Sequence, residues 1–292
     1  MGFLRNLRTA VLKPGILVQY VFFHLARRFL GRPPTLPMPK GMRLHPAGRF
    51  NDYRSVYIQR PGEQELRLVA SLLPKINSTI VDVGANVGAF TMLASSTGSA
   101  GRIIAFEPAH RYCQAFHANM VSNGVRGVSL VQAAVSDTPG IANFREDPAL
   151  PLHGKFDAGI LYSSDIVSVV STVRLDETLQ TFGIAEVDLL KVDVEGAEPS
   201  VIRGARALLE HRKIGAIYLE FIVEHMEDMG ENPKDFVEAI VQHGYDFHEI
   251  MADGSIGRLL DHRKMVDERR VPLGAPNRPW NEINILILRR HS

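Results

Sequence analysis

A short apolar run that breaks into a glycine-containing loop most constrains the fold of this chain. Residues 79–83 have the buried character of a strand, and Gly84, Asn86 and Gly88 follow before a helical pattern begins. Because glycine has no side chain, Gly84 and Gly88 are expected to leave room for a ligand at the backbone and the helix N-terminus. The pattern therefore predicts a strand, turn and helix that hold a nucleotide-like cofactor, although an ordinary strand–turn–helix corner shares it.

The residues of the loop indicate whether its cofactor contains a pyrophosphate or an ammonium group. A dinucleotide-binding loop of the G-x-G-x-x-G kind has its second glycine where this chain has Asn86, and a side chain there impedes a pyrophosphate. Asp82, two residues before Gly84, would repel a diphosphate but would accept hydrogen bonds from an ammonium group. S-adenosylmethionine, which has an ammonium group and no phosphate, therefore fits this loop better than NAD.

A second apolar run, residues 101–106, ends in Glu107 about twenty residues after the first glycine of the loop. A carboxylate at the end of a second strand is placed to accept hydrogen bonds from both ribose hydroxyls of a nucleoside. The alternative is that Glu107 caps the helix predicted at residues 109–122, where the helix dipole favours an acid.

Apolar runs alternate with helical patterns along the rest of the chain. This order predicts an α/β fold with a mostly parallel sheet and helices on both faces. Residues 251–281 are polar without a clear period, and we interpret them as a lid. The further predicted strands are 128–131, 187–194, 214–221, 246–250 and 283–288, and the predicted helices are 62–73, 88–96, 109–122, 175–182, 196–210 and 233–243.

Length and composition set the class of protein. A chain of 292 residues with 45% hydrophobic residues can form one full α/β core, which we assign to residues 61–292 as a Rossmann-like domain. The net charge of +1 gives no case for a nucleic acid partner. The single cysteine, Cys113, excludes an internal disulfide, and we expect a reducing, cytoplasmic location.

Residues 1–60 are predicted to form an N-terminal basic and apolar arm with a linker. Its apolar stretch, residues 16–25, is shorter than the roughly 20 residues that span a bilayer, and it lacks the cleavage site of a signal peptide. The arm is expected to pack on the core or on a partner subunit. The alternative is an amphipathic arm that lies on the cytoplasmic face of a membrane.

A second group of charged residues alternates with valines near position 192. If this segment is a strand, Lys191, Asp193 and Glu195 lie on one face, at the sheet edge where open α/β sheets bind ligands. Asp193 or Glu195 would serve as a general base for a ligand bound at this edge, and Lys191 would orient that carboxylate or meet an acidic group of the ligand. The alternative is a Lys191–Asp193 ion pair, with Glu195 and Glu198 complementing the dipole of the next helix.

No metal is expected, because Asp193, Glu195 and Glu198 have no histidine at a matching spacing. His225, just past the predicted strand 214–221, is interpreted as a loop or helix-cap histidine, with a catalytic role as the alternative. Glu220 is interpreted as an acid at the edge of the core.

Residues 81–88 together with 190–198 resemble the FkbM-type family, a branch of the S-adenosylmethionine-dependent class I methyltransferases. The resemblance extends over roughly 66–250 and includes Glu107-Pro108, Asn119 and residues 173–177. It implies a seven-stranded Rossmann-like sheet, S-adenosylmethionine as methyl donor, and mostly O-methylation of hydroxyls on sugars, glycans or secondary metabolites. On the family pattern, the cofactor contacts are Asp82, Gly84, Asn86, Gly88 and Glu107, and the acceptor side is formed by Lys191, Asp193 and Glu195.

The chain departs from the class I pattern after the third predicted strand. Many class I methyltransferases have an acid there, whereas this chain has Gln132, Ala133 and Ala134, with Asp137 the first acid beyond them. The adenine would then contact the backbone around Ala134, or Asp137 would hold the adenine amine. Alternatively, Asp137 opens the turn at residues 136–140.

Two other functions compete with methyl transfer. An NAD-dependent oxidoreductase or epimerase would explain the loop and Glu107, but it requires a pyrophosphate that Asp82 and Asn86 oppose. A non-catalytic nucleoside-binding module would keep Asp82, Gly84 and Glu107, but changes at Asp193 and Glu195 should leave its binding unaffected.

Overall fold

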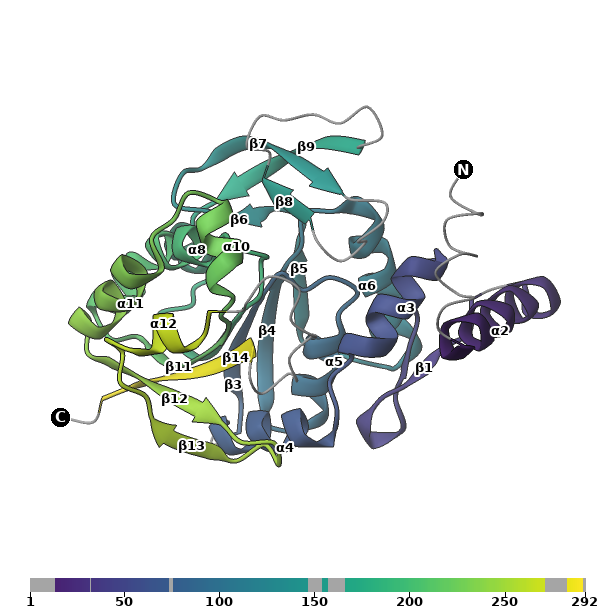
Figure 1. The fold of residues 1–292 in the computed structure, drawn as a ribbon, viewed down its shortest axis with the longest axis horizontal. Helices are drawn as coiled ribbons and strands as arrows, with labels where there is room; N and C mark the ends of the chain where they lie inside the picture. Colours follow the sequence, from purple (N-terminus) through teal and green to yellow (C-terminus); the bar gives the residue numbers. More distant parts are fainter. Residues whose placement is uncertain are drawn as a thin grey trace.

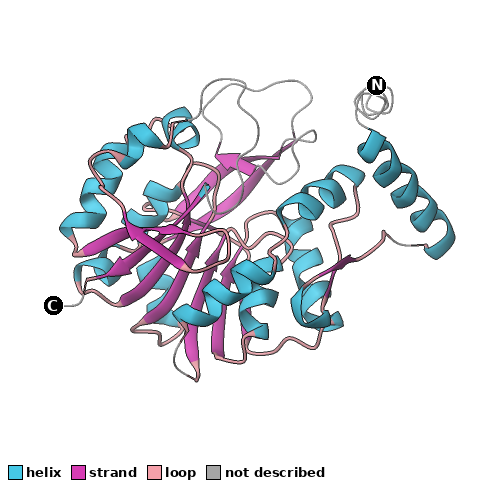
Figure 2. Ribbon diagram, turned by 60° about the horizontal axis from the view of Figure 1, so that its bottom comes forward, coloured by secondary structure: helices cyan, strands magenta, loops and turns pink. Residues whose placement is uncertain are grey.

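A computed structural model describes residues 14–31, 33–73, 76–146, 154–156, 166–270 and 283–290 of the chain. Its centre is an eight-stranded sheet with helices on both faces (Figures 1 and 2). The strand order is β13-β12-β14-β11-β10-β3-β4-β5. The bounds are β3 (Ser78–Val83), β4 (Ala100–Phe106), β5 (Val128–Val131), β10 (Val187–Val192), β11 (Ile214–Glu220), β12 (Tyr245–Ile250), β13 (Ile256–Leu259) and β14 (Asn284–Arg289).

The predicted, mostly parallel α/β fold is confirmed. Strands β5, β4, β3, β10 and β11 pair in parallel, and β14 runs antiparallel between β11 and β12. The sheet has eight strands instead of seven because β13 pairs with β12 at the edge. Strand β13 and helix α12 (Met265–Glu268) lie within residues 251–281, although the sequence there has no clear period, and the lid interpretation stays a prediction. Residues 271–282 lie outside the described part.

The predicted helices are all present, with small shifts at their ends. The one large difference is that 196–210 forms two short helices, α8 and α9, and that α8 begins only at Glu198. The helices of the domain are α4 (Glu63–Leu72), α5 (Ala89–Ser96), α6 (His110–Ser122), α7 (Leu175–Thr181), α8 (Glu198–Gly204), α9 (Arg206–Glu210), α10 (Val223–Asp228) and α11 (Pro233–Gln242).

A second sheet that the sequence patterns did not predict lies beyond β5 (Figure 1). Its order is β6-β9-β7-β8, formed by β6 (Ala134–Val135), β7 (Gly140–Glu146), β8 (Gly154–Phe156) and β9 (Ile166–Val173). Ile141 and Val169 are exposed, so apolar residues lie on both sides of these strands and the alternation that marks a half-buried strand is weak.

The core lies on both faces of the large sheet. Ile80 and Leu189 pack on the side of α4 and α5, whereas Val81 and Leu190 belong to the cluster on the opposite side. This alternation is the two-residue period of a strand. In register, Lys191 of β10 lies beside Asp82 of β3 and Tyr218 of β11, so a row of polar side chains crosses three neighbouring strands on the face of α4 and α5.

The N-terminal segment packs against the domain. It contains α2 (Pro14–Leu30), β1 (Leu36–Pro37), η1 (Pro39–Gly41), β2 (Arg43–Leu44) and α3 (Phe50–Gln59). In α2, the ring of Phe23 is buried, with its centroid 5.6 Å from Phe50 and 5.4 Å from Tyr53. Leu36 and Met38, which belong to the predicted arm and linker of residues 1–60, are also buried in this cluster.

The outer face of α2 stays apolar and exposed at Val18, Val21, Phe22, Leu25 and Phe29. One face of α2 therefore packs on the core, as expected for the N-terminal arm, and the other face is exposed. Across the described ranges, no helix combines the length and the apolar character needed to cross a bilayer.

Candidate active site

The loop after β3 adopts left-handed backbone conformations, with φ of 77° at Gly84, 50° at Asn86 and 87° at Gly88. A Cβ atom at Gly84 would lie 1.9 Å from the carbonyl oxygen of Asp193, so glycine is required there by the loop that follows β10. The sequence had suggested room for a ligand at this position. That reason is wrong, because the neighbouring loop fills the space.

Gly88 is required for helix packing. A Cβ atom there would lie 2.8 Å from Cδ2 of Phe116 and 2.7 Å from Cε of Met120, both in α6. The room predicted for a ligand is again occupied by the protein. Backbone contacts between this loop and a cofactor stay a prediction.

Glu107 follows β4 and ties the glycine loop to α6. Its Oε2 accepts a hydrogen bond from the backbone N–H of Asn86 (2.9 Å), and its Oε1 accepts one from Ala109 (2.8 Å), the N-cap of α6. Burial raises the pKa of Glu107 to about 7, against the two backbone hydrogen bonds that lower it. The capping alternative is therefore present in the structure, and contact with a ribose stays a prediction.

Asp82 and Lys191 form the buried centre of the polar row. Asp82 Oδ2 accepts a hydrogen bond from the hydroxyl of Thr91 (2.6 Å), and Asp82 Oδ1 lies 3.5 Å from Lys191 Nζ. Lys191 Nζ also donates to the carbonyl of Gly84 (3.0 Å) and lies 3.2 Å from Asp193 Oδ2. An ammonium group of the chain itself, that of Lys191, therefore lies beside Asp82. Contact between Asp82 and a cofactor stays a prediction.

The charges of this row stabilise one another. Burial alone would lower the pKa of Lys191, but the carboxylates of Asp193 and Asp82 outweigh it and raise the pKa. Burial raises the pKa of Asp82, while Lys191 and the Thr91 hydrogen bond oppose the shift. Lys191 is consequently held as an ammonium at neutral pH, which suits it to position a carboxylate and excludes it as a base.

The strand expected at 187–194 ends at Val192, and the loop beyond it turns sharply. Glu195 has φ of 57° and Gly196 has φ of 106°. The prediction that Lys191, Asp193 and Glu195 share one strand face is therefore wrong for Glu195. The Asp193 side chain pairs with Lys191, whereas Glu195 Oε2 lies 3.2 Å from Nδ1 of His225.

Glu198 is buried at the start of α8, where its Oε1 accepts hydrogen bonds from the backbone N–H groups of Val194 (3.1 Å) and Gly196 (3.2 Å). The predicted alternative, a Lys191–Asp193 ion pair with Glu195 and Glu198 at the next helix, matches the geometry of Lys191, Asp193 and Glu198, whereas Glu195 lies beside His225. It does not exclude a functional role for Asp193, whose side chain is 41% exposed.

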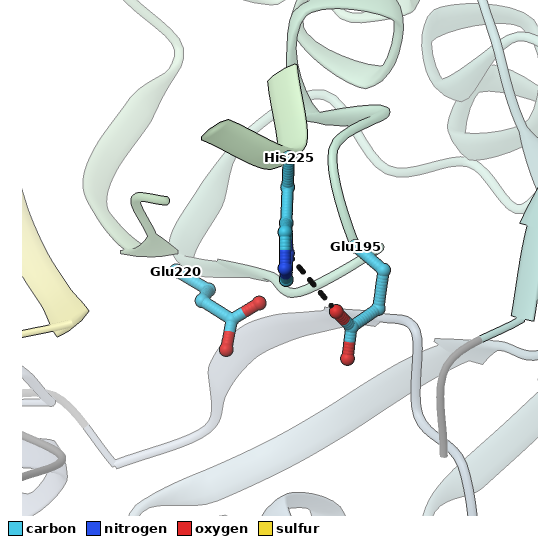
Figure 3. A group of neighbouring side chains, drawn as sticks. All are labelled: Glu195, Glu220 and His225. Atoms are coloured by element: carbon cyan, nitrogen blue, oxygen red, sulfur yellow. Dashed lines mark ion pairs between the residues drawn. The ribbon is translucent and has the colours of Figure 1, made fainter. Parts of the chain in front are cut away.

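Glu220 and His225 join Glu195 at the end of β11 (Figure 3). Glu220 is the last residue of β11, His225 lies in α10, and one ligand atom from each of these three residues lies within 4.8 Å of the others. Burial raises the pKa of Glu220 well above its usual range, and the carboxylates of Asp193, Glu195 and Glu198 raise it further. Its place as a strand-end acid was visible in the sequence, but its neighbours were not.

Glu65 and Tyr218 extend the row on the side of α4, and sequence reasoning missed both. The Tyr218 hydroxyl donates to Glu65 Oε1 (2.8 Å), and the ring of Tyr218 stacks on Phe90 with centroids 5.9 Å apart. A tyrosine inside a buried strand and an acid in an amphipathic helix are ordinary core and surface residues in a sequence, so no signal singled them out.

Ala134 and Asp137 lie at the second sheet. Ala134 is buried in β6 and pairs with Thr172 of β9. The carboxylate of Asp137 contacts Nε of Arg203 (2.6 Å) and accepts a hydrogen bond from the hydroxyl of Ser200 (3.2 Å). Burial favours a raised pKa at Asp137, but the hydrogen bonds and charge of Arg203 outweigh it and lower the pKa. These contacts tie Asp137 to α8, and contact of Asp137 with an adenine stays a prediction.

Comparison with known proteins gives related sequences. The family model described as the methyltransferase FkbM domain matches residues 82–247. Methyltransferase sdnD of Sordaria araneosa is 29% identical over 223 residues, which cover 66% of this chain and 82% of that protein. The 31-O-demethyl-FK506 methyltransferase FkbM of Streptomyces tacrolimicus is 31% identical over 52% of this chain and 66% of its own length. The 2-O-methyltransferase NoeI of Sinorhizobium fredii is 28% identical over 53% of this chain and 68% of its own length.

Proposed function

Because the chain belongs to the methyltransferase FkbM domain family, we propose that it transfers a methyl group from S-adenosylmethionine to a hydroxyl of a sugar, glycan or secondary metabolite. The names of two relatives, 31-O-demethyl-FK506 methyltransferase FkbM and 2-O-methyltransferase NoeI, refer to methylation at oxygen, which supports oxygen as the acceptor atom. The observation that carries the proposal is the polar row at the carboxyl edge of the sheet, where Lys191 joins the strand of the glycine loop to Asp193. Open α/β sheets bind their ligands at this edge.

The residues around Glu107 fit a nucleoside. Each carboxylate oxygen of Glu107 accepts one backbone hydrogen bond, and a carboxylate oxygen can accept two, so both oxygens keep capacity for a ribose diol. We assign the cofactor to the backbone of Gly84, Asn86 and Gly88 and to Glu107, with Asp82 acting through Lys191. For the adenine we favour the backbone near Ala134, because Arg203 and Ser200 already hold the carboxylate of Asp137.

When bound, S-adenosylmethionine supplies a methyl group whose bond to sulfur breaks as the bond to the acceptor oxygen forms, leaving S-adenosylhomocysteine. The chain must hold the acceptor hydroxyl in line with that methyl group and receive its proton. Of the two predicted bases, Asp193 suits this task better, since its side chain is accessible and Lys191 fixes its orientation at 3.2 Å. Glu195 is withdrawn to His225, and Lys191 is a positioning residue.

Thermal unfolding of the purified protein tests the cofactor. S-adenosylmethionine and S-adenosylhomocysteine should each raise the midpoint by several degrees, because a ligand at about 100 times its Kd adds about 2.7 kcal/mol of stability. NAD should have no effect. Stabilisation by NAD alone would replace this proposal with redox chemistry, and no shift with any of the three ligands would contradict the cofactor assignment.

The Asp193→Asn variant tests the base. Methyl transfer to an acceptor found by screening hydroxylated compounds should fall by about 10²-fold or more, because general-base catalysis contributes on that order. The thermal shift with S-adenosylhomocysteine should persist in this variant. Asp267→Asn is the matched control, since Asp267 also pairs with a lysine, Lys234 (2.9 Å), but outside the site. Equal activity of the two variants would remove Asp193 from the mechanism.

A further inference from the structure

Glu195, Glu220 and His225 converge from three separate segments of the chain. They belong to the loop after β10, the end of β11 and helix α10, and Figure 3 shows their polar ends turned toward one another. Two carboxylates and an imidazole are ligand types that proteins use for divalent transition metals. From the sequence no metal was expected at Asp193, Glu195 and Glu198. In the structure, Glu198 accepts hydrogen bonds from the backbone of residues 194 and 196.

The separations suit a shared ion. Two ligand atoms that are each about 2.1 Å from one ion, at tetrahedral or octahedral angles, lie about 3.0–3.4 Å apart. Nδ1 of His225 and Oε2 of Glu195 are 3.2 Å apart. All three ligand atoms lie within 4.8 Å of one another.

A histidine–glutamate ion pair would explain the 3.2 Å separation, but it does not require Glu220. When ionised, Glu220 would add a second negative charge beside Glu195. Lys191, a cation near Glu220, also pairs with Asp82 and Asp193. Carboxylates crowded in a poorly solvated place repel one another unless a cation or a proton lies between them. An ion bound between the three residues would remove that repulsion.

Backbone packing fixes the segments that carry Glu195, His225 and Glu220 before any ion binds. A Cβ atom at Gly196 would lie 2.3 Å from the carbonyl oxygen of His225, so the turn after Glu195 packs directly on the start of α10. Glu220 is fixed independently, because it pairs with Asn284 of β14 at the sheet edge. The His225 side chain is 25% exposed, which leaves an approach for an ion and for a further ligand.

We propose that Glu195, Glu220 and His225 bind one divalent transition-metal ion of the Mn²⁺ or Zn²⁺ kind. The imidazole favours these ions over Mg²⁺ and Ca²⁺, which prefer all-oxygen sites. Binding of the ion is independent of the proposed methyl transfer. A catalytic role for the ion, however, rests on the proposed methyl transfer. Next to Asp193, the ion would bind the acceptor hydroxyl and make its proton easier to remove.

Titration of the metal-depleted full-length protein with Mn²⁺ tests the site. The electron paramagnetic resonance signal of free Mn²⁺ should disappear up to one ion per chain, and Zn²⁺ should displace the bound Mn²⁺. Electron spin echo modulation of the bound ion should show a directly coordinated imidazole nitrogen. This measurement uses the unmodified protein, so it does not depend on the folding of a variant.

Glu220→Gln and His225→Gln should each weaken Mn²⁺ binding by about tenfold or more. His262→Gln is the matched control, because His262 also faces a glutamate, Glu238 (3.9 Å), away from this group. Absence of Mn²⁺ and Zn²⁺ binding, bound Mn²⁺ without nitrogen coupling, or unchanged affinity in both site variants would each overturn the proposal. The S-adenosylhomocysteine thermal shift, measured on the same samples, reports the cofactor site separately.

Discussion

At the scale of single residues, Lys191 holds the site together. Its ammonium contacts Asp82 in β3, the carbonyl of Gly84 in the glycine loop and Asp193 after β10. Lys191→Met would remove the cation and leave the fully buried carboxylate of Asp82 uncompensated. Breaking a buried pair by removing one partner costs about 3–5 kcal/mol, so we expect a loss of that order in the free energy of unfolding, measured with urea.

The double variant Lys191→Met with Asp82→Asn should recover part of this loss, because it also removes the uncompensated charge. Lys234→Met, at the exposed pair with Asp267, should change stability by about 1 kcal/mol or less. If Lys191→Met and Lys234→Met lowered the free energy of unfolding by similar amounts, the buried Asp82–Lys191 pair would contribute no more to stability than an exposed pair.

At the scale of elements, α8 joins the second sheet to the large one. Arg203 Nε lies 2.6 Å from Oδ2 of Asp137 in the turn after β6, and its Nη2 lies 2.6 Å from Oε1 of Glu231 beyond α10. Gly204 lets α8 approach that turn, since a Cβ atom there would lie 2.4 Å from the carbonyl oxygen of Ser136. The turn after β6 is therefore held against this helix.

Arg203→Met should cost about 1 kcal/mol, because half-exposed ion pairs contribute little individually and more when one cation serves two carboxylates. The local effect should be clearer: amide hydrogen exchange should accelerate in β6 and in the turn at residues 136–140. Arg206→Met is the control, since Arg206 pairs with Glu210 on the surface of α9. Unchanged exchange in the Arg203 variant would mean that backbone packing at Gly204 suffices to dock the helix.

At the scale of the whole molecule, the buried acids make stability depend on pH. Burial raises the pKa of Glu65 and of Glu107 to about 7, from an ordinary value of 4.5. Between these values the folded protein binds more protons than the unfolded chain, so stability falls as pH rises. The free energy of unfolding should therefore decrease from about pH 5 to about pH 7, by up to about 1.4 kcal/mol per pH unit for each group.

Urea unfolding at a series of pH values measures this slope, and Glu107→Gln should reduce it. Below about pH 4 the trend should reverse, because Asp137 has a lowered pKa in the folded state and its contribution is lost on protonation. Stability that rises steadily from about pH 5 to about pH 8 would contradict the raised pKa values of Glu65 and Glu107.

The sequence by itself determined most strands of the large sheet and the part of the site formed by the glycine loop, Glu107 and Lys191. The predicted strand 128–131 has the same bounds as β5, and the glycine loop, Glu107 and Lys191 all lie at the carboxyl ends of their strands. These features are local, because apolar periodicity and turn residues record which backbone conformation a short segment prefers. The family resemblance also came from two short segments, and the comparisons confirm it.

Only the tertiary structure decided what surrounds those residues. Gly84 and Gly88 are needed because another loop and α6 occupy the space beside them, and Glu195 leaves the strand to meet His225 and Glu220. The second sheet pairs residues 140–146 with 166–172; the β-branched residues of 166–173 suit a strand, but the partner strand is set by a distant segment. Such contacts form when packing brings distant segments together, and the spacing of residues along the chain does not encode them.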